Sequence, residues 1–476
     1  MQKKQLNIPR SVCLRFCCLL LCMAFMNAVR SQTGQQQVLP LKDFIQQVKQ
    51  FHPVARQAAI LSDKAEANLL MARGGFDPLL NTDASNKTFD SKNYYYYTNP
   101  ELKIPLPIGN IKTGLESNGG ELLNTENTKG KSSYFGVELP LARGLITDKR
   151  RTALQQAKIY RNLAEQEKLQ LINDLLFDAY NSYWQWAGQY RLYSVYTNFI
   201  SIAERRLQLV KIGFNQGDRS AMDTIEAATQ LQNYKLLETE ARQRYLNAAL
   251  DLTNYLWLEN DSAASINERL IPDTINLQNL EKQKLVDEIL TASETRNPAL
   301  KIYNFKSQIL QAEKKLKQQN LLPYVSLKAN LLYKDYSLFK TVDPGYWRNN
   351  YKWGLDISIP LFMREARGDY KNTQLKIKQN ELDYLLKKQQ VQTKIKAYFI
   401  ECSLLRQQLL TTQSMYAGYT ALLRNEELRF QQGESSLFLL ISRETKLLEL
   451  AQKQIELTLK YQKAIYALDW AAGILE

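Results

Sequence analysis

The chain of 476 residues carries a formal net charge of +14, and this length allows one large core or two to three domains. Its single histidine, His52, permits no imidazole pair and no cysteine–histidine zinc cluster. Neither a Walker loop nor a dinucleotide glycine fingerprint is present, and Lys and Arg form no dense block with interleaved aromatic residues. We therefore expect no enzyme activity, no cofactor or metal site and no nucleic-acid partner.

Residues 1–31 have the pattern of a secretory signal peptide. Four basic residues precede an apolar run at Phe16–Phe25, and small and polar residues follow it. The run is shorter than the ~20 residues that a membrane-spanning helix requires. An uncleaved anchor and a lipid-modified Cys22 are the less favoured alternatives. Four of the five cysteines lie in this segment, so a chain cleaved near Ser31 keeps Cys402 and forms no disulfide within itself.

A first repeat is predicted over residues 32–276 and begins with two helices. A helical pattern opens at Leu41–Val48, and a second helix follows Pro53 to about Arg73. Proline disfavours helical geometry in the residue before it, so the chain breaks between the two helices. We interpret His52, which precedes that proline, as a helix-end residue and not as a ligand.

Two strands are predicted between residues 78 and 141. One runs from Leu79 to about Phe89 and the other from Tyr134 to Leu141. The insertion between them contains two more possible strands, Glu101–Pro105 and Ile111–Leu115, and a polar Gly/Asn stretch. This composition is typical of a loop, with room for an added hairpin.

A long helical hairpin over residues 149–258 completes the first repeat. No proline occurs from Leu141 to Ile271, and the arm before the turn would be roughly 95 Å long at 1.5 Å per residue. Helices of this length are stable only when partners pack along their sides. Gly217 tolerates the backbone angles of a helix end and marks the turn.

The same order of elements returns over residues 277–476. Two helices at Leu285–Thr295 and up to about Gln319 precede strands at about 323–361, and a hairpin over 364–474 turns at Gly433. In both repeats the last strand ends in Pro-Leu before the long helices begin. Self-similarity of this kind predicts two copies of one structural unit.

The strands of the second repeat have the clearest pattern. Apolar and polar residues alternate strictly from Val325 onward, and Tyr333, Tyr351 and Trp353 lie near strand ends. This pattern is typical of lipid-facing strands with an interfacial aromatic belt. A half-buried hairpin in a soluble domain has the same local pattern. Four strands are too few to close a barrel, and open sheet edges are not tolerated in lipid. If these strands lie in a membrane, several chains must therefore contribute to one barrel.

Together with this duplicated order, the turn signature Phe-x-x-Gly-x-x-Ser resembles the TolC family of outer-membrane efflux and secretion channels. The signature occurs at Phe214–Ser220 and Phe430–Ser436, and the likeness covers roughly Leu41 to Leu475. It implies an α+β membrane protein built from a duplicated unit of two β-strands plus a long antiparallel helical hairpin. The implied homotrimer forms a 12-stranded outer-membrane β-barrel that a periplasmic α-helical barrel continues.

The resemblance also implies roles for residues at the two helix tips. The expected contacts with a periplasmic adaptor (membrane fusion protein) are Gly217, Asp218, Arg219, Ser220, Gly433, Glu434, Ser435 and Ser436. The adaptor would in turn link the channel to an inner-membrane pump.

Carboxylates that narrow the periplasmic entrance in such relatives correspond to Asp223 and Glu226. The second repeat departs from this pattern, because Leu439 and Ser442 occupy the matching positions. We therefore expect half of the acidic charge, with Arg443-Glu444 nearby as possible substitutes. A solvated helix face is the alternative interpretation of the two acidic residues.

The expected function is the exit duct of a tripartite efflux or type I secretion system. It would lie in the cell outer membrane, contact its lipid and extend helices into the periplasm. The alternative is a secreted periplasmic coiled-coil scaffold or adaptor without transport activity. The cargo stays open, although seven methionines and one histidine favour organic solutes or exported protein over metal cations.

Overall fold

The computed structural model describes residues 37–123, 127–264, 270–273, 286–336 and 350–475. The predicted signal peptide lies outside them. Contacts divide the chain into two compact units, each of which draws on both sequence repeats. Unit 1 takes in the described residues of Met1–Pro53, Leu176–Lys282 and Glu401–Tyr466, and unit 2 those of Val54–Leu175, Gln283–Ile400 and Ala467–Glu476. The boundaries of the repeats themselves stay predictions.

The helices follow the predicted order in both halves of the chain. The first half contains α2 (Leu41–Phe51), α3 (Pro53–Gly74), α4 (Lys149–Gln216) and α5 (Ala221–Thr253). The second half contains α6 (Val286–Arg296), α7 (Pro298–Gln319), α8 (Arg364–Gln431) and α9 (Leu437–Ala472). Because α4 and α8 both have 68 residues, the duplication extends to helix length.

The X-Pro steps end one helix and begin the next, as predicted. His52 is extended between α2 and α3, with a ψ of 135°, and its buried ring stacks on Tyr255 with 5.9 Å between ring centroids. Burial lowers the pKa of His52. At the second step, Asn297 caps α7 by accepting a hydrogen bond from the Ala299 backbone N–H at 2.9 Å.

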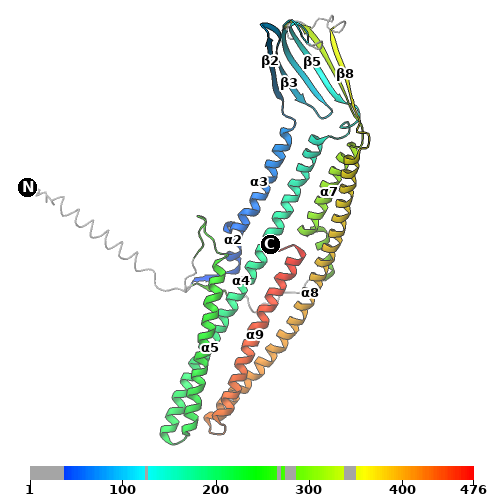
Figure 1. The fold of residues 1–476 in the computed structure, drawn as a ribbon. Coiled ribbons are helices and arrows are strands. Elements are labelled where there is room, and N and C mark those ends of the chain that lie inside the picture. Colours follow the sequence, from blue (N-terminus) through cyan, green and yellow to red (C-terminus); the bar gives the residue numbers. More distant parts are fainter. Residues whose placement is uncertain (1–36, 124–126, 265–269, 274–285, 337–349, 476) are drawn as a thin grey trace, which may run out of the picture. The chain divides into compact units, whose positions relative to one another are not determined.

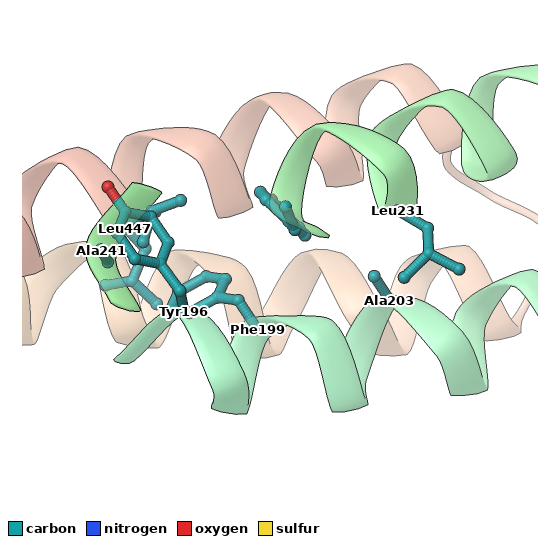
Figure 2. Close-up of a cluster of buried hydrophobic side chains, with 8 residues drawn as sticks. Tyr196, Phe199, Ala203, Leu231, Ala241 and Leu447 are labelled. Atoms are coloured by element: carbon teal, nitrogen blue, oxygen red, sulfur yellow. The ribbon is translucent and has the colours of Figure 1, made fainter. Parts of the chain in front are cut away.

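Apolar side chains from both hairpins form the core of unit 1. Figure 2 shows one such cluster, which consists of Tyr196, Phe199, Ala203, Leu231, Tyr234, Ala241, Leu447 and Leu448. Cys402 of α8 is buried in a second cluster with Leu409 and the α9 residue Leu457, which confirms its prediction as a packing residue. Each large buried side chain contributes about 1.5–3 kcal/mol, and this packing explains how such long helices are stable.

Unit 2 has a separate core and an antiparallel sheet (Figure 1). Its core is formed by residues of α6, α7, α8 and α9, including Leu300, Ile395 and Leu468. The strands of the sheet are β2 (Leu79–Phe89), β3 (Lys92–Pro105), β4 (Asn110–Gly119), β5 (Gly130–Pro140), β7 (Tyr324–Lys334) and β8 (Tyr351–Ser358). They pair in the order β2-β3-β4-β5-β7-β8.

The first repeat therefore contributes four strands to this sheet, β2 to β5, where two were predicted. The possible strands Glu101–Pro105 and Ile111–Leu115 are parts of β3 and β4, which pair with each other and with β2 and β5. The Tyr94-Tyr95-Tyr96-Tyr97 run lies inside β3. Four consecutive aromatic residues hide the period-two alternation by which strands are recognised in a sequence.

Two further strands form a small parallel sheet in unit 1. β1 (Gln37–Leu39) pairs with β6 (Leu270–Pro272), and the Tyr183 hydroxyl donates a hydrogen bond to the Leu39 carbonyl oxygen at 2.7 Å. No helix in the described part of the chain combines the length and the apolar character needed to cross a membrane.

Candidate functional site at the helix turns

The predicted adaptor-contacting residues lie in two helix turns of unit 1 that share one backbone geometry. Gly217 and Gly433 have φ values of +84° and +81°, in the left-handed region that glycine adopts at low cost. After α4, the Gly217 N–H donates to the Phe214 carbonyl at 3.1 Å, and the Asp218 N–H to the Gly213 carbonyl at 2.9 Å.

The turn after α8 repeats both hydrogen bonds. Gly433 donates to Phe430 at 3.2 Å and Glu434 donates to Arg429 at 2.9 Å. Each pair of bonds constitutes a Schellman motif, which satisfies the last carbonyl groups of the helix. The two turns therefore end their helices in the same way.

The helices that leave the turns begin differently. Ser220 caps α5 in a capping box: its hydroxyl accepts from the Asp223 N–H at 3.1 Å, and the Asp223 carboxylate accepts from the Ser220 N–H at 3.1 Å. Ser436 accepts from the Leu439 N–H at 3.3 Å, but leucine cannot return the bond. A Ser-x-x-Asp spacing is close to the usual capping-box pattern, so the sequence contained this signal.

Arg219 joins the two turns within unit 1. Its guanidinium donates to the Phe430 carbonyl oxygen at 3.0 Å and lies 4.0 Å from the centroid of the Phe430 ring. The combination of a hydrogen bond and a cation–π contact fixes the first turn against the end of α8. This contact between residues 211 positions apart has no signal in the sequence.

A small apolar cluster and a polar contact lie next to the turns and hold the ends of the helices together. Val210, Ala227 and Leu437 are buried together, which anchors α4, α5 and α9 next to the tips. On α8, Glu426 is buried and accepts a hydrogen bond from the Ser435 hydroxyl. The turns are thus held by contacts of their own and not only by the long helices.

Glu444, the suggested substitute for the missing entrance carboxylates, is buried inside unit 1. It is 1% exposed and forms an ion pair with Arg206 of α4, whose side chain is 9% exposed. Desolvation raises the pKa of the Glu444 carboxyl, and the paired Arg206 guanidinium opposes that rise. Burial also raises the pKa of the neighbouring Tyr234 hydroxyl to about 12. Glu444 therefore links α4 to α9 inside unit 1 and adds no exposed charge.

Asp223 and Glu226, the predicted entrance residues, are both half-buried beside the first turn. Glu226 lines a hollow of about 450 Å³ together with Tyr419, Arg443 and Lys446. The two cations lower the negative potential of this hollow. Of the two acidic residues, Asp223 belongs to a helix cap and Glu226 faces a hollow of mixed charge.

Large apolar side chains surround these polar groups. Those that follow the two turns include Met222 at 72%, Phe438 at 67%, Ile225 at 64% and Leu439 at 44%. Exposed apolar groups that are close together often mark an interaction site. Met222, Ile225 and Phe438 have no distinguishing signal in the sequence, because isolated apolar residues in a helical pattern are usually assigned to the core.

The predicted belt residues lie in the sheet of unit 2. Tyr351 and Trp353 of β8 are 63% and 66% exposed, and they pair with Leu331 and Ala329 of β7. Tyr333 of β7 pairs with Ser133 of β5. Their role at a lipid interface stays a prediction. Among the described residues, no group of three or more His, Cys, Asp or Glu side chains is placed to hold a metal ion.

Taken together, the long helical hairpins and the antiparallel sheet are the fold of outer-membrane channel proteins. The chain matches the VceC outer-membrane protein of Vibrio cholerae with a TM-score of 0.63 and 16% identity, over 91% of this chain and 96% of that one. It matches the MtrE outer-membrane channel of Neisseria gonorrhoeae in its open state with a TM-score of 0.63 and 15% identity, over 92% and 89% of the two chains.

A third structure, the CmeC outer-membrane channel of Campylobacter jejuni, matches with a TM-score of 0.63 and 14% identity, over 92% of this chain and 86% of that one. No protein-family model and no curated protein matches the sequence. The resemblance to TolC-type channels is therefore confirmed at the level of the fold. The matched structures are channels and membrane proteins, and none is described as an enzyme.

Proposed function

We propose that the protein is a trimeric outer-membrane channel that provides the exit duct of a tripartite efflux or type I secretion system. The observation that carries this proposal is the sheet of unit 2. Its strands β5, β7 and β8 have one apolar face and one polar face, and in the described part of the chain the edge strands β2 and β8 each pair with a neighbour on one side only. Such a sheet satisfies its edges in lipid only by joining other copies. The match to channel structures over about nine-tenths of the chain supports the same conclusion.

Membrane location and conduction test this proposal directly. We expect the expressed chain to fractionate with the outer membrane, to need detergent for extraction, and to form ion-conducting pores in a planar lipid bilayer. A periplasmic scaffold would stay soluble and electrically silent. Soluble monomers without conductance would therefore refute the channel and support the scaffold.

The helix turns are proposed to contact a periplasmic adaptor. Support comes from the exposed apolar side chains Met222, Ile225 and Phe438 beside Asp218 and Glu434, because an interface needs an apolar centre with a polar rim. Photo-crosslinkers placed at Asp218 and Glu434 should capture an adaptor from the periplasm. A crosslinker on the exposed α5 residue Leu250 is the matched control and should capture none.

Asp223 and Glu226 are proposed to bind cations at the periplasmic entrance. In planar bilayers we expect Asp223→Asn and Glu226→Gln to weaken channel block by divalent cations applied to the periplasmic side, since rings of carboxylates attract such ions. Asp223→Glu keeps the charge and the capping-box pattern, and should keep the block. Unchanged block in both neutral variants would contradict the entrance role.

A further inference from the structure

The additional hairpin β3–β4 is the feature of the sheet that the duplicated pattern does not explain. It lies between β2 and β5, in the middle of the strand order and not at an edge. β3 pairs with β2 from Leu79↔Lys103 to Phe89↔Lys92, and β4 pairs with β5 from Asn110↔Glu138 to Asn118↔Gly130. The hairpin is therefore hydrogen-bonded on both sides along most of its length.

The apolar face of the sheet continues across the hairpin. The register places Leu102 and Ile104 of β3 beside Thr113 and Ile111 of β4. Ile111 pairs in turn with Val137 of β5, and that row continues to Ala329 and Trp353. Because paired residues in a sheet share a face, the inserted strands present the same kind of surface as β5, β7 and β8.

The opposite face is polar across the same strands. Lys103 of β3 and Lys112 of β4 form ion pairs with Glu138 of β5 at 3.2 and 3.1 Å. Tyr134 of β5 donates a hydrogen bond to Glu101 of β3 at 2.5 Å, and Lys328 of β7 pairs with Asp356 of β8 at 2.6 Å. Ion pairs and polar contacts on one face and apolar residues on the other are the two sides of a wall between water and lipid.

We infer that β3–β4 is part of the lipid-facing wall, so that each copy of the chain contributes six strands to it and not four. This inference rests on the proposed channel function. An even number of antiparallel strands makes the edge strands β2 and β8 run in opposite directions, so β8 of one copy can pair antiparallel with β2 of the next. The occupant of both edges is therefore a second copy of this chain.

The number of strands determines the diameter of the barrel that this wall encloses. Barrel diameter grows roughly linearly with strand number, so three copies with six strands each would enclose a bore about one and a half times as wide as twelve strands would. Barrels of about 16–18 strands leave an aqueous channel. A barrel with the hairpin would therefore admit bulkier cargo than one without it.

Single cysteines in a Cys402→Ser chain test the position of the hairpin. The purified full-length protein is placed in vesicles of brominated phospholipid, and a fluorescent label on each cysteine reports quenching by lipid or by aqueous iodide. We expect Leu102→Cys and Ile111→Cys to be quenched by the lipid, and their neighbours Lys103→Cys and Lys112→Cys by iodide. Leu327→Cys and Lys328→Cys of β7 are the matched controls.

The controls separate the two proposals. Lipid quenching at Leu327 with iodide quenching at both Leu102 and Ile111 would place the hairpin outside the membrane and overturn the inference alone. Iodide quenching at Leu327 as well would overturn the channel proposal with it. As a second measurement, electron cryomicroscopy in lipid nanodiscs should show six strands per copy, and four per copy would contradict the inference.

Discussion

The turn between α4 and α5 and the turn between α8 and α9 have the same backbone and different chemistry. Both contain a left-handed glycine and both Schellman hydrogen bonds. Only the first turn is followed by a reciprocal capping box, because Asp223 has Leu439 as its counterpart. The comparison shows that duplication preserved what ends a helix and left the side chains around it free to differ.

The two turns also depend on each other through contacts between the hairpins. Arg219 of the first turn contacts Phe430 of the second, and Arg206 of α4 pairs with Glu444 of α9. The Arg219 contact is asymmetric, because Ser435 occupies the position that matches Arg219, although Phe430 has Phe214 as its counterpart. Differences between the repeats are therefore as important to the packing of unit 1 as their similarity.

The largest effect is expected from breaking the Arg206–Glu444 pair. Arg206→Ala leaves a buried carboxylate without its partner, which typically costs about 3–5 kcal/mol. We expect a large fall in the thermal unfolding midpoint, measured by circular dichroism in detergent. The double variant Arg206→Met/Glu444→Leu removes both charges and should recover most of the loss, because apolar replacement of a buried pair is often close to neutral. A single variant as stable as the wild type would show that the pair has no structural role.

Replacing the turn glycines tests whether the two backbones are equivalent. Gly217→Ala and Gly433→Ala each place a side chain at positive φ, at a cost of about 1–2 kcal/mol. No atom lies within 4 Å of the added carbon at either position, so the two costs should be equal. The thermal midpoint of each variant measures this. A clear difference between them would mean that the turns differ in strain as well as in side chains.

The sequence predicted the elements that depend on local pattern. Strict alternation predicted β7 and β8, and the X-Pro steps at His52 and Asn297 predicted the helix breaks. Of β3, only the end at Glu101–Pro105 was predicted as a possible strand, because the Tyr94–Tyr97 run has no alternation. Contacts such as Arg206–Glu444 were unpredictable, since 238 positions separate the two residues and only the packing of α4 with α9 brings them together.

The helix caps should show a smaller and unequal effect. Ser220→Ala is expected to destabilise the protein by about 1 kcal/mol, a typical value for loss of a cap. Ser436→Ala should cost less, because its bond is longer at 3.3 Å, whereas the Ser220 hydroxyl also donates a hydrogen bond to the Asp223 carboxylate at 3.0 Å. Chemical unfolding of both variants in parallel would measure the difference. Equal losses would indicate that the hydrogen bond between the Ser220 hydroxyl and the Asp223 carboxylate adds nothing to the first cap.

The smallest effect is expected at Arg219. Arg219→Lys keeps the charge but loses the planar group that stacks on Phe430, so we expect a loss of about 0.5–1 kcal/mol. Arg219→Ala should lose slightly more, because the hydrogen bond to the Phe430 carbonyl disappears too. Hydrogen exchange of the Asp218 and Glu434 amides would report whether both turns loosen together. Faster exchange in the first turn alone would show that the contact does not couple them.

The place of the β3–β4 hairpin in the strand order has a consequence for how such a protein can change. Because the hairpin lies between β2 and β5, adding or removing it leaves the outermost strands untouched, and with them the seams between copies in the proposed channel. Because strands are then added or removed in pairs, neighbouring strands around the proposed barrel stay antiparallel. Pore calibre could therefore evolve, or be engineered, by exchanging a single internal segment without redesigning the assembly.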